Sequence, residues 1–308
     1  MEIALQFVLL ALGFVMLAKG ADWFVEGAAG IAMRFGIPQL VIGLTIVAMG
    51  TSAPEAAVSI AAAVKGNADI TIGNIVGSNI LNILVILGLA ASIVPIAVAR
   101  STVRIEIPFM IGVTALLFYQ GRDGSISLAD GGVLMVAFAV YMMYLYTMAM
   151  KSNVDSDLEE SGLPLGRCLL GAVGGLALII AGSNVTVGAA TSIATYAGLS
   201  ERFIGLTIVA LGTSLPELFT SVAAARRGNA DIAIGNIVGS NIFNILFVVG
   251  LSALIIDIPF ASAFNFDTYV ALGAAVLLWL CVLRTQRLQR WAGALMLVCY
   301  AAYLGYIL

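Results

Sequence analysis

Two glutamates occur in matching short frames, and apolar residues surround each of them. Glu55 ends the segment Gly-Thr-Ser-Ala-Pro-Glu, and Glu217 ends the segment Gly-Thr-Ser-Leu-Pro-Glu. An acidic side chain near the centre of a membrane helix costs about 3 kcal/mol on insertion scales, so a matched pair needs a functional explanation. Hydroxyl groups stand beside both carboxylates, and they belong to Thr51, Ser52, Thr213 and Ser214. Because hard cations prefer such oxygens, the two segments predict a cation site.

A second motif supplies amide oxygens and further hydroxyls. The segment Gly-Asn-Ile-Val-Gly-Ser-Asn-Ile-Leu-Asn at 73–82 has a copy at 235–244 that differs only by Phe in place of Leu. Residues four apart share one face of a helix. The pairs placed on one face in this way are Ser78 with Asn82 and Ser240 with Asn244. Asn74 and Asn236 lie elsewhere on the helix, and we expect them to make packing hydrogen bonds rather than to bind ions.

A proline precedes each glutamate and alters the backbone around it. Pro54 and Pro216 cannot donate a backbone hydrogen bond, and their rings clash with the carbonyl four residues earlier. We therefore expect carbonyls one turn earlier, at Ala48 and Ala210, to be freed or tilted toward a cavity. Irregular backbone is tolerated at membrane depth only where it lines a cavity or is buried in protein. The predicted donors are thus all oxygens, and two carboxylates balance the charge of one Ca²⁺.

The two motifs are parts of a longer internal duplication. Residues 42–91 align without a gap on residues 204–253, an offset of 162, and 36 of the 50 positions are identical. The duplication therefore covers both segments that carry the candidate ligands.

The composition excludes a water-soluble enzyme. Apolar residues make up 61% of the 308 residues, charged residues make up 10%, and the mean hydropathy is +1.08. The chain has no histidine and only three cysteines, which excludes a Ser-His-Asp triad, a zinc site of the His-Glu-x-x-His type and a Cys/His cluster. The net charge is −3, so no nucleic-acid partner is expected.

Ten apolar runs are long enough to cross a membrane as helices. They cover residues 3–33, 40–64, 70–94, 103–120, 128–150, 168–198, 203–225, 231–256, 267–284 and 290–308. The chain divides into a first half at 1–150, an acidic linker at 151–167 and a second half at 168–308. Because each half holds an odd number of spans, the second half enters the membrane from the opposite side. The predicted fold is an all-α polytopic membrane protein with ten transmembrane helices in two inverted five-helix repeats.

The positions of lysine and arginine predict the orientation, because basic residues stay on the cytoplasmic side. With the N-terminus outside, ten basic residues fall in cytoplasmic loops and three in outer loops, while Lys19 lies inside the first span. Lys65 then faces outward, and its repeat partner Arg227 faces the cytoplasm. We expect a multi-pass protein of the plasma (inner) membrane with both termini outside. Inverted repeats are typical of secondary transporters, whose binding site lies near the bilayer midplane.

Two further groups of charged residues are not assigned to transport. Lys19, Asp22 and Glu26 fall at spacings of three and four, which predicts an internal ion pair near the end of the first span. The acidic run at 155–160 lacks the glycine and the final glutamate of an EF-hand, so we expect a solvated linker.

The paired motifs, one copy of each per half, resemble the two α-repeats of the calcium/cation antiporter superfamily. The resemblance is closest to its sodium/calcium exchanger branch and is most specific over 42–91 and 204–253. It implies that the glutamates are shared Ca²⁺ ligands, that nearby hydroxyls and carbonyls complete Na⁺ sites, and that the first span of each half slides across the core. The implied ion ligands are Ala48, Thr51, Ser52, Glu55, Ser78, Asn82, Ala210, Thr213, Ser214, Glu217, Ser240 and Asn244.

The resemblance also sets expectations about partners. It implies Ca²⁺ and Na⁺ as transported ions. From the apolar composition we expect membrane lipid as the surroundings, and we expect a monomeric protein without a bound cofactor. Asn82 and Asn244 depart from those relatives that carry an acid in this region. The resulting site has fewer carboxylates, which argues against coupling to potassium.

The leading hypothesis is a sodium-driven antiporter that extrudes Ca²⁺ through alternating access of a midplane site. A calcium/proton antiporter that uses the same glutamates is the first alternative, although a proton has no need of the neighbouring hydroxyls. An intramembrane enzyme with a glutamate pair and a cation channel are the alternatives from other classes. Neither of them requires an inverted duplication of every ligand.

Overall fold

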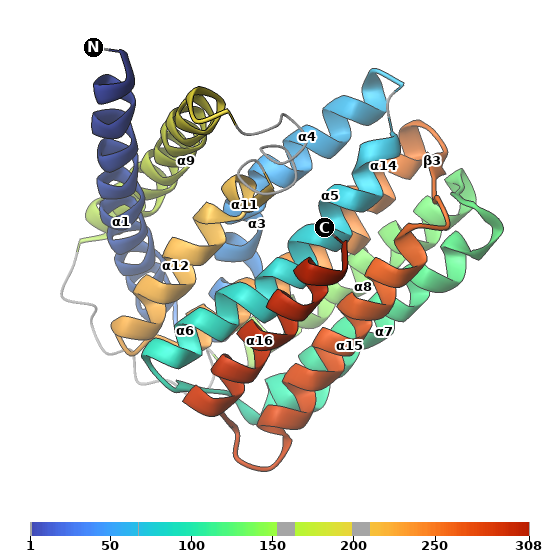
Figure 1. Cartoon of the computed structure of the whole chain (residues 1–308). Helices are drawn as coiled ribbons and strands as arrows, with labels where there is room; N and C mark the ends of the chain where they lie inside the picture. The colour runs from blue at the N-terminus through green and yellow to red at the C-terminus, as the bar shows by residue number, and fades with distance from the viewer. Residues whose placement is uncertain (1, 67, 153–163, 199–209, 308) are drawn as a thin grey trace.

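The computed structural model describes residues 2–66, 68–152, 164–198 and 210–307 (Figure 1). Helices dominate these ranges, and eight of them are long and apolar enough to cross a membrane. They are Ile3–Arg34, Ile70–Ile93, Thr102–Asp123, Leu128–Lys151, Leu165–Tyr196, Ala230–Ile255, Phe264–Leu283 and Arg290–Ile307. The prediction of an all-α membrane protein is confirmed, while the acidic run at 155–160 lies outside the described residues.

Short irregular turns divide several of these spans into consecutive elements. The first half contains α1 (Glu2–Arg34), α2 (Gln39–Ile42), η1 (Gly43–Val47), α3 (Ala48–Thr51), α4 (Ala53–Val64), α5 (Asp69–Leu81), η2 (Asn82–Leu87), α6 (Gly88–Ile93), β1 (Ile96–Ala97), η3 (Thr102–Glu106), α7 (Ile107–Gln120), η4 (Gly121–Asp123), β2 (Ser125–Ile126) and α8 (Leu128–Ser152). The second half contains α9 (Leu165–Tyr196), α11 (Ala210–Thr213), α12 (Leu215–Arg226), α13 (Ala230–Phe243), η6 (Asn244–Val249), α14 (Gly250–Ile255), β3 (Ile258–Pro259), α15 (Phe264–Leu283), β4 (Arg287–Leu288) and α16 (Arg290–Ile307). Among them, η1, η2, η3 and η6 are π-helical turns.

The second predicted span is present as a helix bent by 52° between residues 39–51 and 53–64. The bend lies at Ser52, and Pro54 occupies the first turn of α4. The N–H groups of a first turn have no partner within the helix, so proline costs no hydrogen bond there. Its counterpart, predicted at 203–225, is described only from residue 210 onward, as α11 and α12. With the bent helix counted as one span, the described residues contain nine of the ten predicted crossings.

The two central helices of the protein carry the second motif. One is α5 continued by η2 and α6, and the other is α13 continued by η6 and α14. Most of their residues are buried, as expected for helices that are apolar on every side. In each case the π-helical turn begins at an asparagine, Asn82 or Asn244. Such turns recur at functional sites, and these two are related by the repeat offset.

Several contacts between the two halves occur twice, in pairs that the repeat relation exchanges. The short strand β1 pairs with β4, and β2 pairs with β3, both antiparallel. The strands β1 and β3 are repeat equivalents, as are β2 and β4, so both pairings cross between the halves. Helices follow the same rule, since α16 packs against α6 and α8 packs against α14. The two halves are therefore intertwined rather than placed side by side.

Glycines bring α1 and α9 into close contact at one edge of the molecule (Figure 1). A Cβ added at Gly20 would lie 2.9 Å from the Gly175 carbonyl oxygen, and one added at Gly182 would lie 3.1 Å from the Gly13 carbonyl oxygen. These contacts form a glycine seam between the two helices. Gly13 lies beside Gly182 and Gly20 lies beside Gly175, so the residue numbers rise along α1 as they fall along α9, and the helices run antiparallel. Antiparallel contact between repeat equivalents is what an inverted repeat requires, and small residues permit such close packing in membranes.

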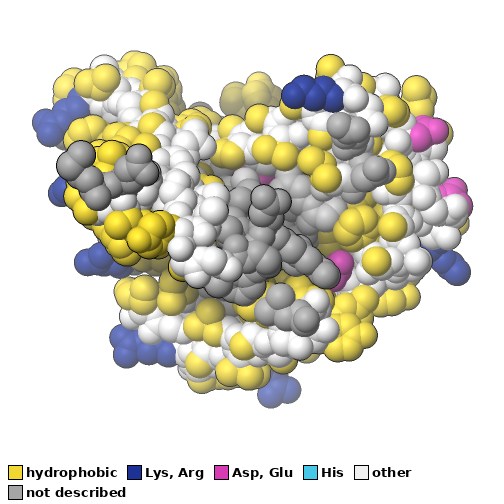
Figure 2. Space-filling model, turned by 45° about the horizontal axis from the view of Figure 1, so that its top comes forward, with side chains coloured by type: hydrophobic (Ala, Val, Ile, Leu, Met, Phe, Trp, Pro, Cys, Tyr) yellow, Lys and Arg dark blue, Asp and Glu magenta, His cyan; other side chains and the backbone are white. Residues whose placement is uncertain are grey.

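The outer surface suits contact with lipid. Hydrophobic side chains cover much of the face seen in Figure 2, and charged side chains are scattered among them. Large apolar side chains exposed on the outer helices include Leu5 and Val8 on α1, Val136 on α8, Leu170 on α9 and Val298 on α16.

The glycine seam predicts a difference in stability between two neighbouring substitutions. In Gly175→Ala the new methyl group would lie 2.5 Å from the Phe24 nitrogen and 2.7 Å from the Gly20 oxygen, both backbone atoms that cannot move aside locally. We expect the free energy of unfolding to fall by about 1–3 kcal/mol, measured by titration with sodium dodecyl sulfate and circular dichroism. Gly174→Ala is the control, because its methyl group meets no atom within 4 Å. Equal stability of the two variants would contradict the described seam.

Candidate functional site

Both glutamates lie in the first turn after a break in a helix. Ser52, with φ −81° and ψ 6°, separates α3 from α4, and Ser214, with φ −91° and ψ 4°, separates α11 from α12. The proline beside each break fits the first turn of the new helix. The side chains of Glu55 and Glu217 are each only 1% exposed. The breaks therefore place two carboxylates in the protein interior rather than against lipid.

Each serine at a break reaches the glutamate of the other half. Ser52 Oγ donates to Glu217 Oε1 at 2.8 Å, and Ser214 Oγ donates to Glu55 Oε1 at 3.4 Å. These two bonds are exchanged by the repeat relation, so the two breaks must face each other across the centre of the protein. The structure thus brings together the carboxylates and hydroxyls that the first motif predicts.

Four asparagines of the central helices form a cluster that also crosses between the halves. Asn79 Nδ2 donates to the Asn241 carbonyl and Asn241 Nδ2 donates to the Asn79 carbonyl, both at 3.2 Å. Asn82 Nδ2 donates to Asn241 Oδ1 at 2.9 Å, and Asn244 Nδ2 donates to Asn79 Oδ1 at 3.1 Å. Because these bonds hold the amide nitrogens of Asn82 and Asn244, they also orient the two amide oxygens.

Two repeat-related pairs of oxygens remain unsatisfied in this region. Glu55 Oε2, Glu217 Oε2, Asn82 Oδ1 and Asn244 Oδ1 are buried and have no hydrogen-bond partner among the described residues. The helix α4, which carries Glu55, packs against η6, and α12, which carries Glu217, packs against η2. Each glutamate helix therefore contacts the π-helical turn that begins with the other half's asparagine. Buried acceptors without a donor are costly, and a bound cation removes that cost.

A second pair of asparagines fastens each glutamate helix to the next helix. Asn74 Nδ2 donates to Ser59 Oγ at 2.9 Å and to the Glu55 backbone carbonyl at 3.3 Å. Asn236 makes the same two bonds with the equivalent residues of the second half, at 2.9 Å and 3.4 Å. The prediction that these two asparagines make packing hydrogen bonds is confirmed. Their bonds fix the backbone from which the carboxylates project.

The backbone carbonyl of Ala48 is placed differently from the expectation. It accepts the Ser52 N–H at 3.0 Å and the Ser240 hydroxyl at 3.3 Å, so it is shared rather than freed. The reason is the spacing along the helix. The N–H that Pro54 lacks would bond the carbonyl of residue 50, so its absence does not free the carbonyl of residue 48. Thr51 Oγ1 lies 3.0 Å from Asn236 Oδ1, which links this segment to the second half.

The remaining predicted ligands lie on the same elements. Ser78 is buried in α5, Thr213 is half-buried at the end of α11, and Ala210 is the first residue of α11. Residues 204–209 of the predicted duplication lie outside the described ranges.

Three buried residues of the structure were not predicted from the sequence: Asn79 and Asn241, which bond across the halves, and a third carboxylate, Glu106. Both asparagines are repeat equivalents, so the duplication itself held the signal that could have revealed them. Glu106 lies at the end of the π-helical turn η3, is fully buried, and accepts a hydrogen bond from the Tyr144 hydroxyl. Its repeat equivalent is Thr268, so the duplication gave no signal, although an acid inside a predicted span was visible.

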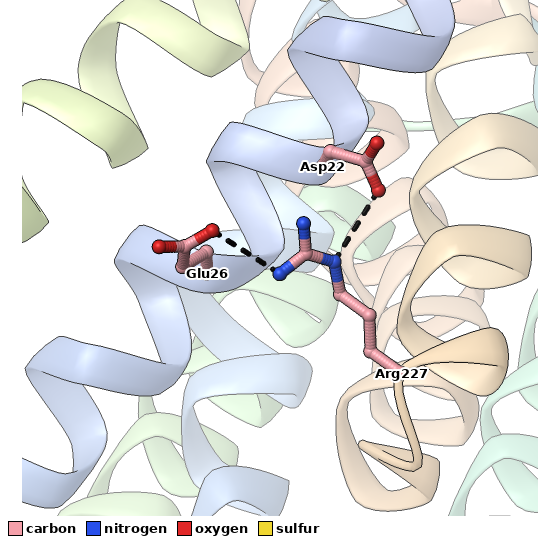
Figure 3. A network of polar contacts seen from close by, with 3 residues as sticks. All are labelled: Asp22, Glu26 and Arg227. Atoms are coloured by element: carbon pink, nitrogen blue, oxygen red, sulfur yellow. Dashed lines mark hydrogen bonds and ion pairs between the residues drawn. The ribbon is translucent and has the colours of Figure 1, made fainter.

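The prediction of an ion pair internal to the first span is wrong, because Asp22 and Glu26 pair with Arg227 of the second half (Figure 3). Arg227, which follows α12, contacts Asp22 at 3.3 Å through Nε and Glu26 at 3.2 Å through Nη1. The helical spacing correctly places the two carboxylates on one face, but that face lies against the second half. An arginine can bond two carboxylates at once through different nitrogens, which the single lysine predicted as partner does less well.

Comparisons with known proteins agree on one family. The family model described as "Sodium/calcium exchanger protein" matches residues 5–147 and 168–308. The chain is 40% identical to the putative antiporter CaxA of Alkalimonas amylolytica over 98% of both chains, and 41% identical to the inner membrane protein YrbG of Escherichia coli over 80% of this chain and 79% of that protein. A solved structure of the sodium-calcium exchanger NCX_Mj superposes with a TM-score of 0.87 at 32% identity, covering 99% of this chain and all of that one.

The asparagine cluster predicts energetic coupling between two residues of different halves. Asn79→Ala and Asn244→Ala remove the same hydrogen bond, so the double variant should lose about 1 kcal/mol less stability than the sum of the single variants. Detergent unfolding of the four proteins measures this cycle. Asn74→Ala combined with Asn244→Ala is the control, because those side chains share no bond and their effects should add. Additive losses in the first cycle would show that the bond does not form.

Proposed function

The chain belongs to the sodium/calcium exchanger family, and on this premise we propose that it exchanges Ca²⁺ for Na⁺ by alternating access. As a member of an exchanger family it is a membrane transporter rather than an enzyme. The proposed site lies between the two halves, at the helix breaks that carry Glu55 and Glu217. The structural similarity of the chain to NCX_Mj over nearly its whole length supports the proposed exchange.

The observation that carries the proposal is a set of four buried oxygens that have no hydrogen-bond partner in the part of the chain that the structure describes. They are Glu55 Oε2, Glu217 Oε2, Asn82 Oδ1 and Asn244 Oδ1. Ca²⁺ takes about 6–8 oxygens, so further donors are required. We assign them to the hydroxyls of Thr51, Ser52, Ser78, Thr213, Ser214 and Ser240 and to the carbonyls of Ala48 and Ala210.

Charge balance explains how such a site couples two ions. Two ionised carboxylates are neutralised by one Ca²⁺, and Na⁺ ions that occupy the same oxygens also reduce the buried charge. An uncompensated charge is expensive inside a membrane, so a protein with an empty or half-neutralised site resists changing sides. Competition for shared oxygens is then sufficient to couple the movement of the two ions.

Two finer points follow for the proposed transporter. The residues at the start of both π-helical turns are amides, Asn82 and Asn244, so we propose that transport does not require potassium. We also propose an inner-membrane location with both termini outside and two functional halves, 1–150 and 168–308, joined by the linker 151–167. The distribution of basic residues and the similarity to an inner membrane protein support this arrangement.

Flux measurements in proteoliposomes test the coupling ion. An outwardly directed Na⁺ gradient should drive ⁴⁵Ca²⁺ uptake, and K⁺ or pH gradients of equal size should not. Uptake that follows the pH gradient and ignores Na⁺ would overturn the sodium assignment in favour of a proton antiporter. Uptake that needs no counter-ion gradient would indicate a channel.

Removing either carboxylate should abolish Ca²⁺ exchange. In Glu55→Gln and in Glu217→Gln a single negative charge is left, which cannot balance Ca²⁺ in a buried site. We expect the sodium-dependent ⁴⁵Ca²⁺ flux to fall at least a hundredfold, corresponding to about 2.7 kcal/mol or more. Glu106→Gln is the matched control, since it replaces a buried glutamate outside the site and keeps an acceptor for Tyr144. Exchange that persists in both site variants would show that the ions bind elsewhere.

A further inference from the structure

Besides its close packing on α9, the helix α1 contacts α12 of the second half through a pair of aromatic rings and, at the end of α12, through ion pairs. The Phe14 ring on α1 lies 6.1 Å from the Phe219 ring on α12, measured between centroids. Farther along, Asp22 and Glu26 bond Arg227 just beyond the end of α12 (Figure 3). The order of these contacts shows that α1 and α12 run in the same direction.

The repeat relation provides an internal comparison for these contacts. The positions equivalent to Asp22 and Glu26 are Asn184 and Gly188 on α9, and the position equivalent to Arg227 is Lys65. Neither Asn184 nor Gly188 carries a charge, so α9 has no carboxylate at the positions equivalent to Asp22 and Glu26. Among the described residues, α9 and α4 also lack the packing that α1 and α12 make. Within the described ranges, the attachment is therefore present on one side of the pseudo-twofold axis and has no equivalent on the other.

This asymmetry matters because inverted repeats relate the two access states. If the halves were identical in sequence, exchanging their conformations would convert one state into the other at equal free energy. Any contact that forms in only one state shifts the equilibrium toward that state. The ion pairs that Arg227 makes with Asp22 and Glu26 join α1, at the molecular edge, to the end of α12, which carries Glu217. If α1 moves along α12 between the two states, these ion pairs form in only one of them.

We propose that Asp22, Glu26 and Arg227 form a one-sided latch that favours the access state in which α1 lies along α12. The inference rests on the proposed alternating access and adds a residue-level reason for unequal populations of the two states. With both termini outside, Arg227 lies on the cytoplasmic side, so the latch favours closure of that side.

The exposure of the latch suits a contact that must break in every cycle. The three side chains are between 36% and 42% exposed, so water and salt weaken their attraction. Exposed ion pairs each shift an equilibrium by about two- to fivefold. A buried ion pair would stabilise one access state by too much for repeated cycling, because its separation leaves unpaired charges away from water.

Single-molecule fluorescence transfer in proteoliposomes without ion gradients measures the populations directly. Fluorophores attached through unnatural amino acids at the exposed positions Met33 on α1 and Trp291 on α16 would report how α1 moves against the core. We expect Arg227→Gln to lower the ratio of latched to unlatched molecules about two- to tenfold. Arg226→Gln is the matched control, since it removes the same charge from the neighbouring exposed residue and should change the ratio less than twofold.

A gain-of-contact variant tests the asymmetry itself. Asn184→Asp combined with Gly188→Glu builds the missing carboxylates opposite Lys65, and a Cβ at Gly188 meets no atom within 4 Å. We expect this variant to populate the opposite state and so to lower the latched fraction, although Arg227 is intact. An unchanged latched ratio in both Arg227→Gln and the gain-of-contact variant would overturn the latch.

The two readouts separate the latch from the transport assignment. Altered populations without Na⁺-driven ⁴⁵Ca²⁺ flux would contradict the proposed exchange and leave the latch in place. Normal flux with equal populations in Arg227→Gln, Arg226→Gln and the parent protein would contradict the latch and leave the exchange in place.

Discussion

A carboxylate held away from water must be neutralised, and the interior of this protein is arranged around two of them. Glu55 and Glu217 receive one serine hydroxyl each, and each keeps an oxygen that no described residue bonds. No basic side chain bonds either of them among the described residues. Their remaining charge is therefore available to a cation, and the amide oxygens of Asn82 and Asn244 face the same need for a donor or an ion.

The irregular backbone follows from the same constraint. Ions need oxygens at a common centre, whereas a straight membrane helix uses its carbonyls internally. The breaks at Ser52 and Ser214 turn the glutamates inward, and the π-helical turns begin at the two asparagines that supply amide oxygens. Irregular segments of this kind persist in a membrane only where they line a cavity or are buried in protein. The intertwined packing of the halves provides that cover, with lipid-facing helices on the outside.

Around a nearly symmetric site the scaffold is clearly asymmetric. The hydrogen bonds at the helix breaks and among the asparagines occur in pairs related by the repeat, so both halves hold the site in the same way. The attachment of α1 through Arg227 and the buried Glu106 with Tyr144 have no repeat equivalents. In the proposed exchange, symmetry near the proposed ligands lets one set of oxygens serve both sides of the membrane. Differences far from the ligands can then change the balance between states without changing the site.

The sequence by itself determined the membrane class, the duplication and the residue types of the site. Composition identifies lipid as the surroundings, and 36 identities in 50 positions mark Glu55 and Glu217 as a related pair. Periodicity also places Asp22 and Glu26 on one helix face, but it cannot say which segment lies opposite. Only the tertiary structure decided that Arg227 is their partner, because contacts between segments distant in sequence depend on how the helices cross. For the same reason, only the structure revealed that the asparagines orient each other across the two halves.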